Sequence, residues 1–202
     1  SPNNPTGGVT SEENLRGIAE IAKRHEIFVF SDEAYEKLIL GGMKHVSIGS
    51  LSGMRDLTIN QFTLSKTYAM TGWRLGYCAA QKDIMAPIKK VSLYSITHVS
   101  SIVQKAAVAA ITGPQDCVKE MVEEFKVRGK ILADGLNATG KISCIVPEGA
   151  FYAFANISRL NMKSEEFVLK MIKEAGVSAI NGSSFGASGE GYVRFCFANS
   201  RE

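Results

Sequence analysis

The chain has 202 residues, with 23 lysines and arginines against 20 aspartates and glutamates, which gives a formal net charge of +3. Apolar residues make up 45% and charged residues 21%, a globular composition that excludes disordered, collagenous and coiled-coil proteins. The uncharged stretch over residues 91–104 is too short and too polar to span a bilayer, so no membrane association is expected. No dense basic run is present, so no nucleic-acid partner is predicted.

The cysteines and histidines suggest no metal site. Cys144 and Cys196 lie in apolar runs, where buried, reduced thiols are expected. No CxxC pair occurs, and reduced thiols predict a reducing compartment, hence the cytoplasm. His25, His45 and His98 are dispersed without ligand spacing, so we predict no bound metal.

Helical and strand patterns alternate in the first half of the chain. A capping-box pattern at Thr10 and Glu13 predicts a helix that ends near His25. Apolar runs typical of strands occur at residues 27–30, 58–64 and 75–80. The first run follows the helix directly, which predicts a buried parallel strand. A mostly helical pattern then covers 84–112, and the alternation predicts an α/β layer.

The pattern changes after Gly113-Pro114. A long helix follows, with Val118 and Phe125 on its apolar face, and a second helix is predicted over 167–175 after a cap at Ser164. Short strands are predicted at residues 142–146, 151–155 and 192–198. We expect residues 1–113 to form part of a mainly parallel-sheet large domain and 114–202 to form a small α+β domain, entered through the long helix.

Polar residues follow the predicted strands at positions where an open parallel sheet binds ligands. The segment Ser31-Asp32-Glu33-Ala34-Tyr35 directly follows the first apolar run, with Tyr35 three residues after Asp32. Asp32 suits either a ligand crevice or a simple cap on the next turn.

A lysine follows the second predicted strand. Lys66 is either a desolvated nucleophile or a solvated surface lysine. The hydroxyls of Thr63 and Ser65, together with Arg74 eight residues after Lys66, could hold a phosphate dianion. Position alone leaves these alternatives open.

Taken together, four segments resemble the class I/II aminotransferases, pyridoxal 5′-phosphate enzymes of fold type I in the aspartate aminotransferase family. These segments are Asn4-Pro5-Thr6-Gly7, Asp32-Glu33-Ala34-Tyr35, Ser65-Lys66 and Gly72-Trp73-Arg74-Leu75-Gly76-Tyr77. Their order and spacing match, and the resemblance covers the whole chain.

The resemblance implies a role for each cofactor-contacting residue. Lys66 resembles the lysine that binds the cofactor covalently and moves the substrate's α-proton. Asp32 resembles the carboxylate that pairs with the pyridinium nitrogen, which keeps the ring able to accept electrons. Tyr35 and Asn4 resemble the groups that hydrogen-bond the cofactor's phenolic oxygen.

The phosphate and substrate groups follow from the same resemblance. Arg74 resembles the phosphate-binding arginine, with Thr63 and Ser65 as hydroxyl donors, although the family usually has Ser or Gly at the position of Thr63. Arg194, in Gly191-Tyr192-Val193-Arg194-Phe195, resembles the arginine that grips the substrate α-carboxylate. Asn4 is expected beside that substrate site.

The family's phosphate loop, its ring-stacking aromatic residue and a tyrosine that crosses the dimer interface precede the segment at Asn4. The chain opens on Ser1-Pro2-Asn3 without an initiator methionine, so we interpret it as a C-terminal fragment that is inactive alone. The resemblance implies a homodimeric amino-acid aminotransferase when complete, acting on an amino acid and a 2-oxo acid. A β-lyase on the same scaffold and an aminotransferase-like sensor domain of a transcription regulator remain alternatives.

Overall fold

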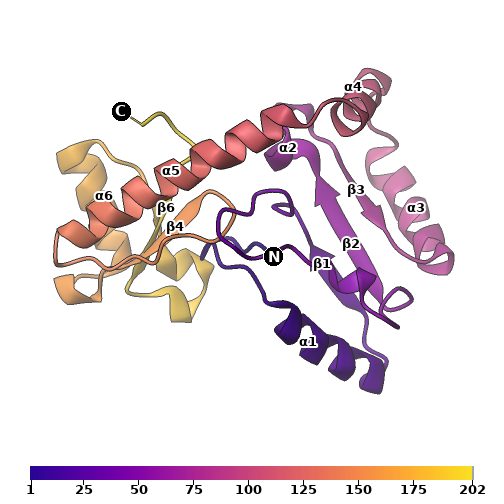
Figure 1. The fold of residues 1–202 in the computed structure, drawn as a ribbon, viewed down its shortest axis with the longest axis horizontal. Coiled ribbons are helices and arrows are strands. Elements are labelled where there is room, and N and C mark those ends of the chain that lie inside the picture. Colours follow the sequence, from indigo (N-terminus) through magenta and orange to yellow (C-terminus); the bar gives the residue numbers. More distant parts are fainter. Residues whose placement is uncertain (202) are drawn as a thin grey trace. The chain divides into compact units, whose positions relative to one another are not determined.

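The computed structural model describes residues 1–201, which form two compact units (Figure 1). The first unit comprises Ser1, Thr10–Lys37 and Met43–Lys119. The second comprises Pro2–Val9, Leu38–Gly42 and the chain from Glu120 onward. The change of unit falls inside helix α5 (Asp116–Ala138), not at Gly113, and two N-terminal segments also belong to the second unit.

The first unit contains a three-stranded sheet in which β2 lies between β1 and β3 (Figure 1). Strands β1 (Val29–Asp32) and β2 (Thr58–Thr63) run parallel, whereas β3 (Gly76–Ala79) runs antiparallel to β2. The sheet is therefore mixed, because the chain returns after β2 through a tight connection instead of a crossover helix. The carboxyl ends of β1 and β2 and the amino end of β3 consequently meet at one edge.

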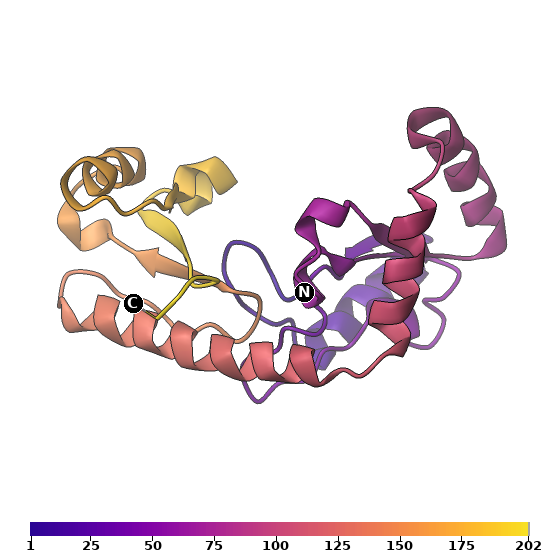
Figure 2. The same ribbon diagram turned by 90° about the horizontal axis from the view of Figure 1, so that it is seen from above.

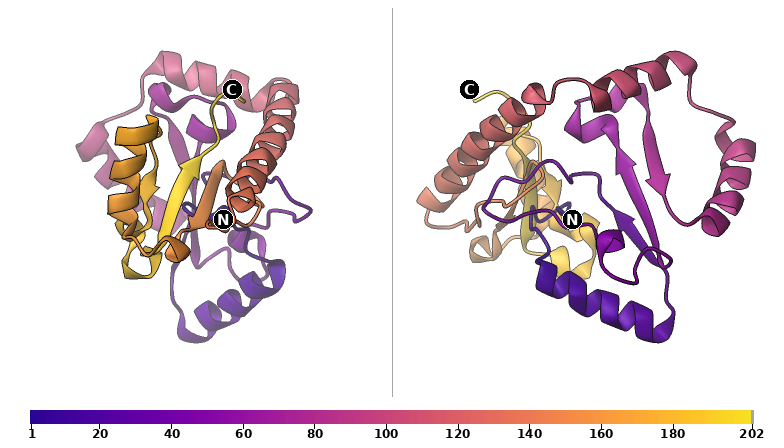
Figure 3. Two further views of the ribbon diagram at one scale, coloured as in Figure 1. Left: turned by 90° about the vertical axis from the view of Figure 1, so that its left-hand side faces the viewer. Right: turned by 45° about the vertical axis from the view of Figure 1, so that its right-hand side comes forward.

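Helix α1 (Glu12–His25) lies on the β1 side of this sheet (Figures 1 and 3). Its N-cap is Ser11, whose Oγ accepts a hydrogen bond from the Asn14 N–H at 3.2 Å. The predicted Thr10–Glu13 capping box is therefore wrong by one residue. Leu15, Ala19 and Ala22 form the buried face of α1 and pack with Ile48 and Met54 in the core of this unit.

Strand β1 is covered on one face only among residues 1–201. Val29 packs against the core beneath α1, whereas Phe28 and Phe30 are 60% and 65% exposed. Successive side chains of a strand point to opposite faces, so the expectation of a fully buried strand is wrong for the described part of the chain.

Three helices complete the first unit. Helix α2 (Leu64–Thr67) follows β2 directly. The predicted helical run over 84–112 is two helices, α3 (Lys82–Ile96) and α4 (Ser101–Thr112), seen as separate elements in Figure 1. Thr97 separates them because its φ of 59° lies in the left-handed region. No helix among residues 1–201 has both the length and the apolarity needed to cross a membrane.

The second unit contains an antiparallel sheet of order β4–β6–β5, formed by Tyr152–Asn156, Tyr192–Cys196 and Ile180–Asn181. This sheet lies between α5 and α6 (Ser164–Ala175), as Figures 2 and 3 show. The Phe125 ring of α5 packs against the rings of Phe151 and Phe197 at 5.6 and 6.1 Å. The strand predicted over 142–146 is reduced to one bridge between Ser143 and Asn156.

Two local predictions in this unit are wrong. Ser164 is the first residue of α6 and not its cap, and its Oγ lies 3.0 Å from Oε2 of Glu190. Cys144 is buried, which raises the pKa of its thiol, but Cys196 at the end of β6 is exposed. An apolar run therefore predicts burial only for residues on the covered face of a strand.

Candidate active site

Asp32 is the last residue of β1, and Tyr35 lies in the turn that follows. Oδ1 of Asp32 accepts a hydrogen bond from the Ala34 N–H at 3.1 Å, so its carboxylate supports this turn. Asp32 remains exposed, whereas Tyr35 is buried, with 8% of its surface accessible. Asp32 therefore supports the turn and is exposed at the end of the strand.

Thr63, Ser65 and Lys66 lie where β2 passes into α2. The Thr63 hydroxyl accepts a hydrogen bond from the Ser65 N–H at 3.1 Å and donates to the Leu75 carbonyl at 3.2 Å, so it caps the helix. Ser65 is buried and Lys66 is half-buried. Thr63 uses its proton locally, whereas the position of Ser65 in the first turn of α2 puts its hydroxyl near the strand end.

Arg74 reaches the same edge from the third strand. It follows the 3₁₀ turn η2 (Thr71–Trp73) with φ 53°, and its Nη1 donates to the Thr71 carbonyl at 2.9 Å. Thr63 lies opposite Gly76 in the β2–β3 pair, two residues beyond Arg74. The exposed Arg74 therefore lies at the edge of the sheet where β2 leads into Lys66.

The register of the sheet brings these segments together. Asp32 is paired with Gln61 in the parallel β1–β2 ladder, so the two strands end side by side. In the first unit, the segments that meet at this edge thereby carry residues with a carboxylate, a phenol, hydroxyls, an amine and a guanidinium. These residues are Asp32, Tyr35, Thr63, Ser65, Lys66 and Arg74.

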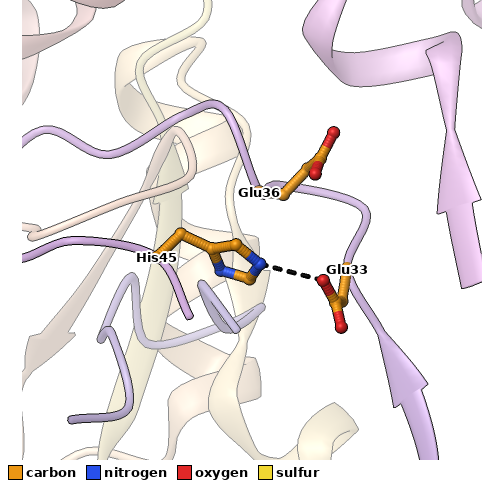
Figure 4. Close-up of side chains that lie close together, drawn as sticks. All are labelled: Glu33, Glu36 and His45. Atoms are coloured by element: carbon orange, nitrogen blue, oxygen red, sulfur yellow. Dashed lines mark hydrogen bonds and ion pairs between the residues drawn. The ribbon is translucent and has the colours of Figure 1, made fainter. Parts of the chain in front are cut away.

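A buried carboxylate beside this edge was not expected from the sequence. Glu33 is 2% exposed, and it lies 2.9 Å from Nε2 of His45 (Figure 4). Glu33, Glu36 and His45 have possible ligand atoms within 4.8 Å of one another. The sequence did not predict this cluster of Glu33, Glu36 and His45, because His45 lies outside the motif that contains the two glutamates. The sequence signal that pointed to it is the acidic pair Asp32-Glu33 at a strand end.

The environment of Glu33 favours its ionised form. Burial alone would raise the pKa of the Glu33 carboxyl, but hydrogen bonds from His45, Ser47 and Ser31 outweigh it and keep that pKa below its ordinary value. The Ser47 and Ser31 hydroxyls lie 2.7 and 3.0 Å from Oε1. The carboxylate is thus held by donors from β1 and from the loop before η1 (Ile48–Ser50).

The second unit positions Arg194 and Asn4. Arg194 lies on β6, and its Nη1 donates to Oδ1 of Asn4 at 2.7 Å. The guanidinium lies over the rings of Tyr152 and Phe185, with 4.3 and 5.0 Å to their centroids. Tyr152 and Phe185 are contacts that the sequence did not predict for Arg194.

One nitrogen of Arg194 lacks a partner. Its Nε is buried and has no hydrogen-bond partner among the described residues. A buried N–H without an acceptor is costly, and an arginine fork binds a carboxylate through two parallel N–H groups. Arg194 therefore has a fixed orientation, and its buried Nε is a donor without an acceptor among the described residues.

The loop carrying Asn4 packs tightly against β4. Gly7 has φ 69°, and a Cβ at this position would lie 2.7 Å from the Tyr152 carbonyl oxygen and 2.9 Å from Cβ of Pro147. The Gly7 N–H donates to the Asn3 carbonyl at 2.9 Å, which closes the turn around Asn4. Glycine is thus required where this turn approaches the strand.

Comparison with known proteins agrees with this geometry. The family model "Aminotransferase class I and II" matches residues 1–202. The chain is 40% identical over 204 residues to aromatic-amino-acid aminotransferase 2 of Thermococcus litoralis and 42% identical over 204 residues to an aspartate aminotransferase of Pyrococcus abyssi. Each match covers 100% of this chain and 52% of the relative, so the chain spans about half the length of the curated relatives it matches.

A solved structure of an aminotransferase also matches the whole chain. The aromatic aminotransferase from Pyrococcus horikoshii is 40% identical and superimposes with a TM-score of 0.96, over 100% of this chain and 54% of that one. The match extends over both compact units. The chain therefore belongs to the aminotransferase class I and II family.

Proposed function

We propose that the complete protein is an amino-acid aminotransferase that transfers an amino group to a 2-oxo acid with pyridoxal 5′-phosphate. The observation that carries this proposal is the pairing of β1 with β2, which brings the segments of Asp32 and Lys66 to one sheet edge. Amino-group transfer with this cofactor requires a carboxylate that keeps the pyridine nitrogen protonated and an amine that moves the proton of the substrate's Cα. Family membership supports the same conclusion.

The donor set at this edge fits the proposed cofactor. The phosphate requires a cation and hydroxyl donors, and Arg74 and Ser65 supply them. The pyridine nitrogen requires an acid or a carboxylate, and Asp32 is exposed at the strand end. The phenolic oxygen requires a donor such as the Tyr35 hydroxyl, and the aldehyde requires an amine, for which Lys66 is proposed. Thr63, whose hydroxyl proton goes to the Leu75 carbonyl, and Asn4, which belongs to the second unit, are proposed on the family resemblance alone.

When bound, the cofactor accepts the electron pair left on the substrate's Cα after a proton is removed. Nζ of Lys66 would remove that proton, since a free amine is a competent base. The Asp32 carboxylate keeps the pyridine nitrogen protonated through an ion pair. The Tyr35 hydroxyl orients the cofactor's phenolic oxygen and tunes its basicity.

Arg194 is proposed to bind the substrate's α-carboxylate. Its guanidinium is oriented by Asn4 and by the Tyr152 and Phe185 rings, and its buried Nε has no acceptor among the described residues. A planar fork held in one orientation binds a carboxylate with little further loss of side-chain entropy. All α-amino acids and 2-oxo acids carry this carboxylate, so Arg194 selects the substrate class and not the side chain.

The remaining assignments follow from the family. We propose that residues 1–113 belong mainly to the cofactor-binding large domain and that 114–202 form the small domain, adjusted at the segments that the second unit shares. The complete enzyme is proposed to be a cytoplasmic homodimer. The relatives are named for aromatic amino acids and for aspartate, so both classes are the first substrates to test.

The proposal is tested by measuring amino transfer from a panel of amino acids to 2-oxoglutarate with the complete protein and added pyridoxal phosphate. We expect glutamate formation that requires the cofactor and is strongest with an aromatic or acidic donor. Release of ammonia without an acceptor would instead indicate a β-lyase. Cofactor binding without either reaction would favour a sensor domain.

A further inference from the structure

Glu33 joins three segments of the first unit through its side chain. Oε1 accepts hydrogen bonds from the Ser31 and Ser47 hydroxyls and from Nδ2 of Asn60, and Oε2 contacts Nε2 of His45. Ser31 and Asn60 are directly paired residues of β1 and β2. The carboxylate therefore ties the β1–β2 pair to the loop before η1.

The loop side of this network is also tightly packed. Nδ2 of Asn60 donates a second hydrogen bond to the Ser47 hydroxyl at 2.8 Å. A Cβ on Gly49 would lie 2.2 Å from Oδ1 of Asn60, so the loop backbone presses directly on that side chain. The network has little room to rearrange.

Glu33 lies between the two residues whose orientation the proposed chemistry needs. Its N–H donates to the Gln61 carbonyl at 2.9 Å, and its own carbonyl accepts from the Glu36 N–H at 3.2 Å. Alternation along the strand places Glu33 on the face opposite Asp32. The backbone of Glu33 thus starts the turn that carries Tyr35. Its side chain holds the start of this turn through hydrogen bonds on the face of the sheet opposite Asp32.

We propose that Glu33 is a positioning residue: its buried carboxylate, held by Ser31, His45, Ser47 and Asn60, fixes the Asp32–Tyr35 segment against the cofactor. The proposal rests on the proposed aminotransferase function. The cluster with His45 and Glu36 (Figure 4) is not assigned to a metal, because Glu33 already has hydrogen-bond partners on both carboxylate oxygens. A small displacement of reacting groups can lower a rate by about a hundredfold. Holding the Asp32–Tyr35 segment in place through Glu33 should therefore raise the rate of the reaction.

The test uses the complete protein with pyridoxal phosphate and compares Glu33→Gln with the wild type. Glutamine keeps the size of the side chain but loses one acceptor oxygen and the charge. We expect kcat to fall roughly ten- to a hundredfold, with a smaller change in the amino-acid KM. The pH titration of the bound cofactor's visible absorbance should also shift, because Asp32 and Tyr35 set it.

Glu190→Gln is the matched control. Glu190 is a carboxylate in the second unit that accepts from the Ser164 N–H at 2.8 Å and from its hydroxyl at 3.0 Å. It tests whether any loss of a hydrogen-bonded carboxylate slows the enzyme. We expect its kcat and absorbance titration to match the wild type even if its melting temperature falls.

Non-additivity separates positioning from general destabilisation. If Glu33 acts through the Asp32–Tyr35 segment, Glu33→Gln should have a much smaller effect on kcat in a Tyr35→Phe background than in the wild type. His45→Gln provides a second variant that keeps Glu33 charged, and it should produce the same absorbance shift in weaker form. It replaces Glu33→Gln if that variant does not fold.

The outcomes are distinct. Wild-type kcat and an unshifted titration in folded Glu33→Gln, or in His45→Gln where the first variant is unfolded, overturn the positioning role and leave the proposed function intact. A fully additive effect with Tyr35→Phe also overturns it. A wild-type protein that neither binds pyridoxal phosphate nor transfers an amino group overturns the function and, with it, this inference.

Discussion

Nη1 of Arg194 lies 2.7 Å from Oδ1 of Asn4, although 190 positions separate the two residues in the sequence. The contact links the last strand of the second unit to a loop at the start of the chain that belongs to the same unit. Because the amide oxygen occupies one donor of the guanidinium, the arginine is oriented before any anion binds. We therefore expect the orientation of this guanidinium to matter for amino-acid binding.

Arg194→Lys should weaken amino-acid binding much more than cofactor binding. Lysine retains the charge but loses the planar fork and the stacking on Tyr152 and Phe185. We expect the amino-acid KM of the complete enzyme to rise at least tenfold, which corresponds to about 1.4 kcal/mol. The affinity for pyridoxal phosphate, measured by absorbance titration, should stay close to that of the wild type. A variant with lowered cofactor affinity and an unchanged KM would assign Arg194 to the phosphate site or the core.

Asp32→Asn should retain cofactor binding but lose most turnover. An amide cannot hold the proton on the pyridine nitrogen, whereas Lys66 remains available for the covalent link. The loss of one preorganised electrostatic group typically lowers kcat by about two to three orders of magnitude. Single-turnover kinetics with the complete protein measures the effect. Turnover at the wild-type rate would exclude this role for Asp32.

Glu124 should contribute a pH-dependent stabilisation of the second unit. Hydrogen bonds from Arg201 and Arg128 lower the pKa of the Glu124 carboxyl from 4.5 to about 2. Because the folded-state pKa is the lower one, the contribution is present above the unfolded pKa and disappears as the pH falls towards 2. In urea unfolding followed between about pH 5 and pH 2, Glu124→Gln should have a flatter stability profile than the wild type.

Glu123→Gln is the control for that experiment. It makes the same change of charge one residue earlier on α5, where Glu123 pairs with the nearby Lys126 at 2.6 Å. Surface pairs of this kind contribute little, so its profile should follow that of the wild type. Equal flattening in both variants would show that net charge, and not the arginine pair, causes the effect.

Residues 1–202 alone should bind pyridoxal phosphate weakly and have no aminotransferase activity. The chain spans about half the length of its curated relatives, and an effective site needs its contacting groups held to within about 0.5 Å. The exposed Phe30 on β1 and Phe28 just before that strand should also favour self-association. Cofactor absorbance, turnover and light scattering of the purified chain check these expectations. Turnover comparable to that of the complete enzyme would contradict them.

Local sequence patterns predicted the strands, but their ends differ by one or two residues, because polar residues extend the short apolar runs. The run predicted over 27–30 is strand β1 at Val29–Asp32, so Asp32 is the last residue of the strand, whereas Lys66 lies in α2 after β2. The direction of β3 was not predicted, since an apolar run carries no information about strand orientation. The cap of α1 shifted from Thr10 to Ser11 because neighbouring hydroxyl residues compete for one role.

Contacts between residues that are separated in the sequence could not be predicted from the sequence alone. The Glu33–His45 contact requires a loop to fold back over 12 residues, and the orientation of Arg194 by Asn4 requires a complete second unit. The exposure of Cys196 depends on which face of β6 is covered. Composition and periodicity describe the element and its apolar positions, whereas these features depend on how elements pack.

The proposed function depends most directly on Lys66. Lys66→Ala in the complete protein should abolish amino transfer and the visible absorbance of the lysine-bound cofactor, because Lys66 is the only lysine among the residues proposed for this site. Activity should not return with added cofactor, since the missing group also moves the substrate's α-proton.

The decisive measurement is borohydride reduction of the complete wild-type protein with bound pyridoxal phosphate, followed by peptide mapping. Reduction makes the link between cofactor and lysine permanent, so the labelled peptide identifies the residue. We predict one labelled peptide, which contains Thr63-Leu64-Ser65-Lys66, and no label in Lys66→Ala. A label on another lysine, or unchanged labelling in the variant, would contradict it.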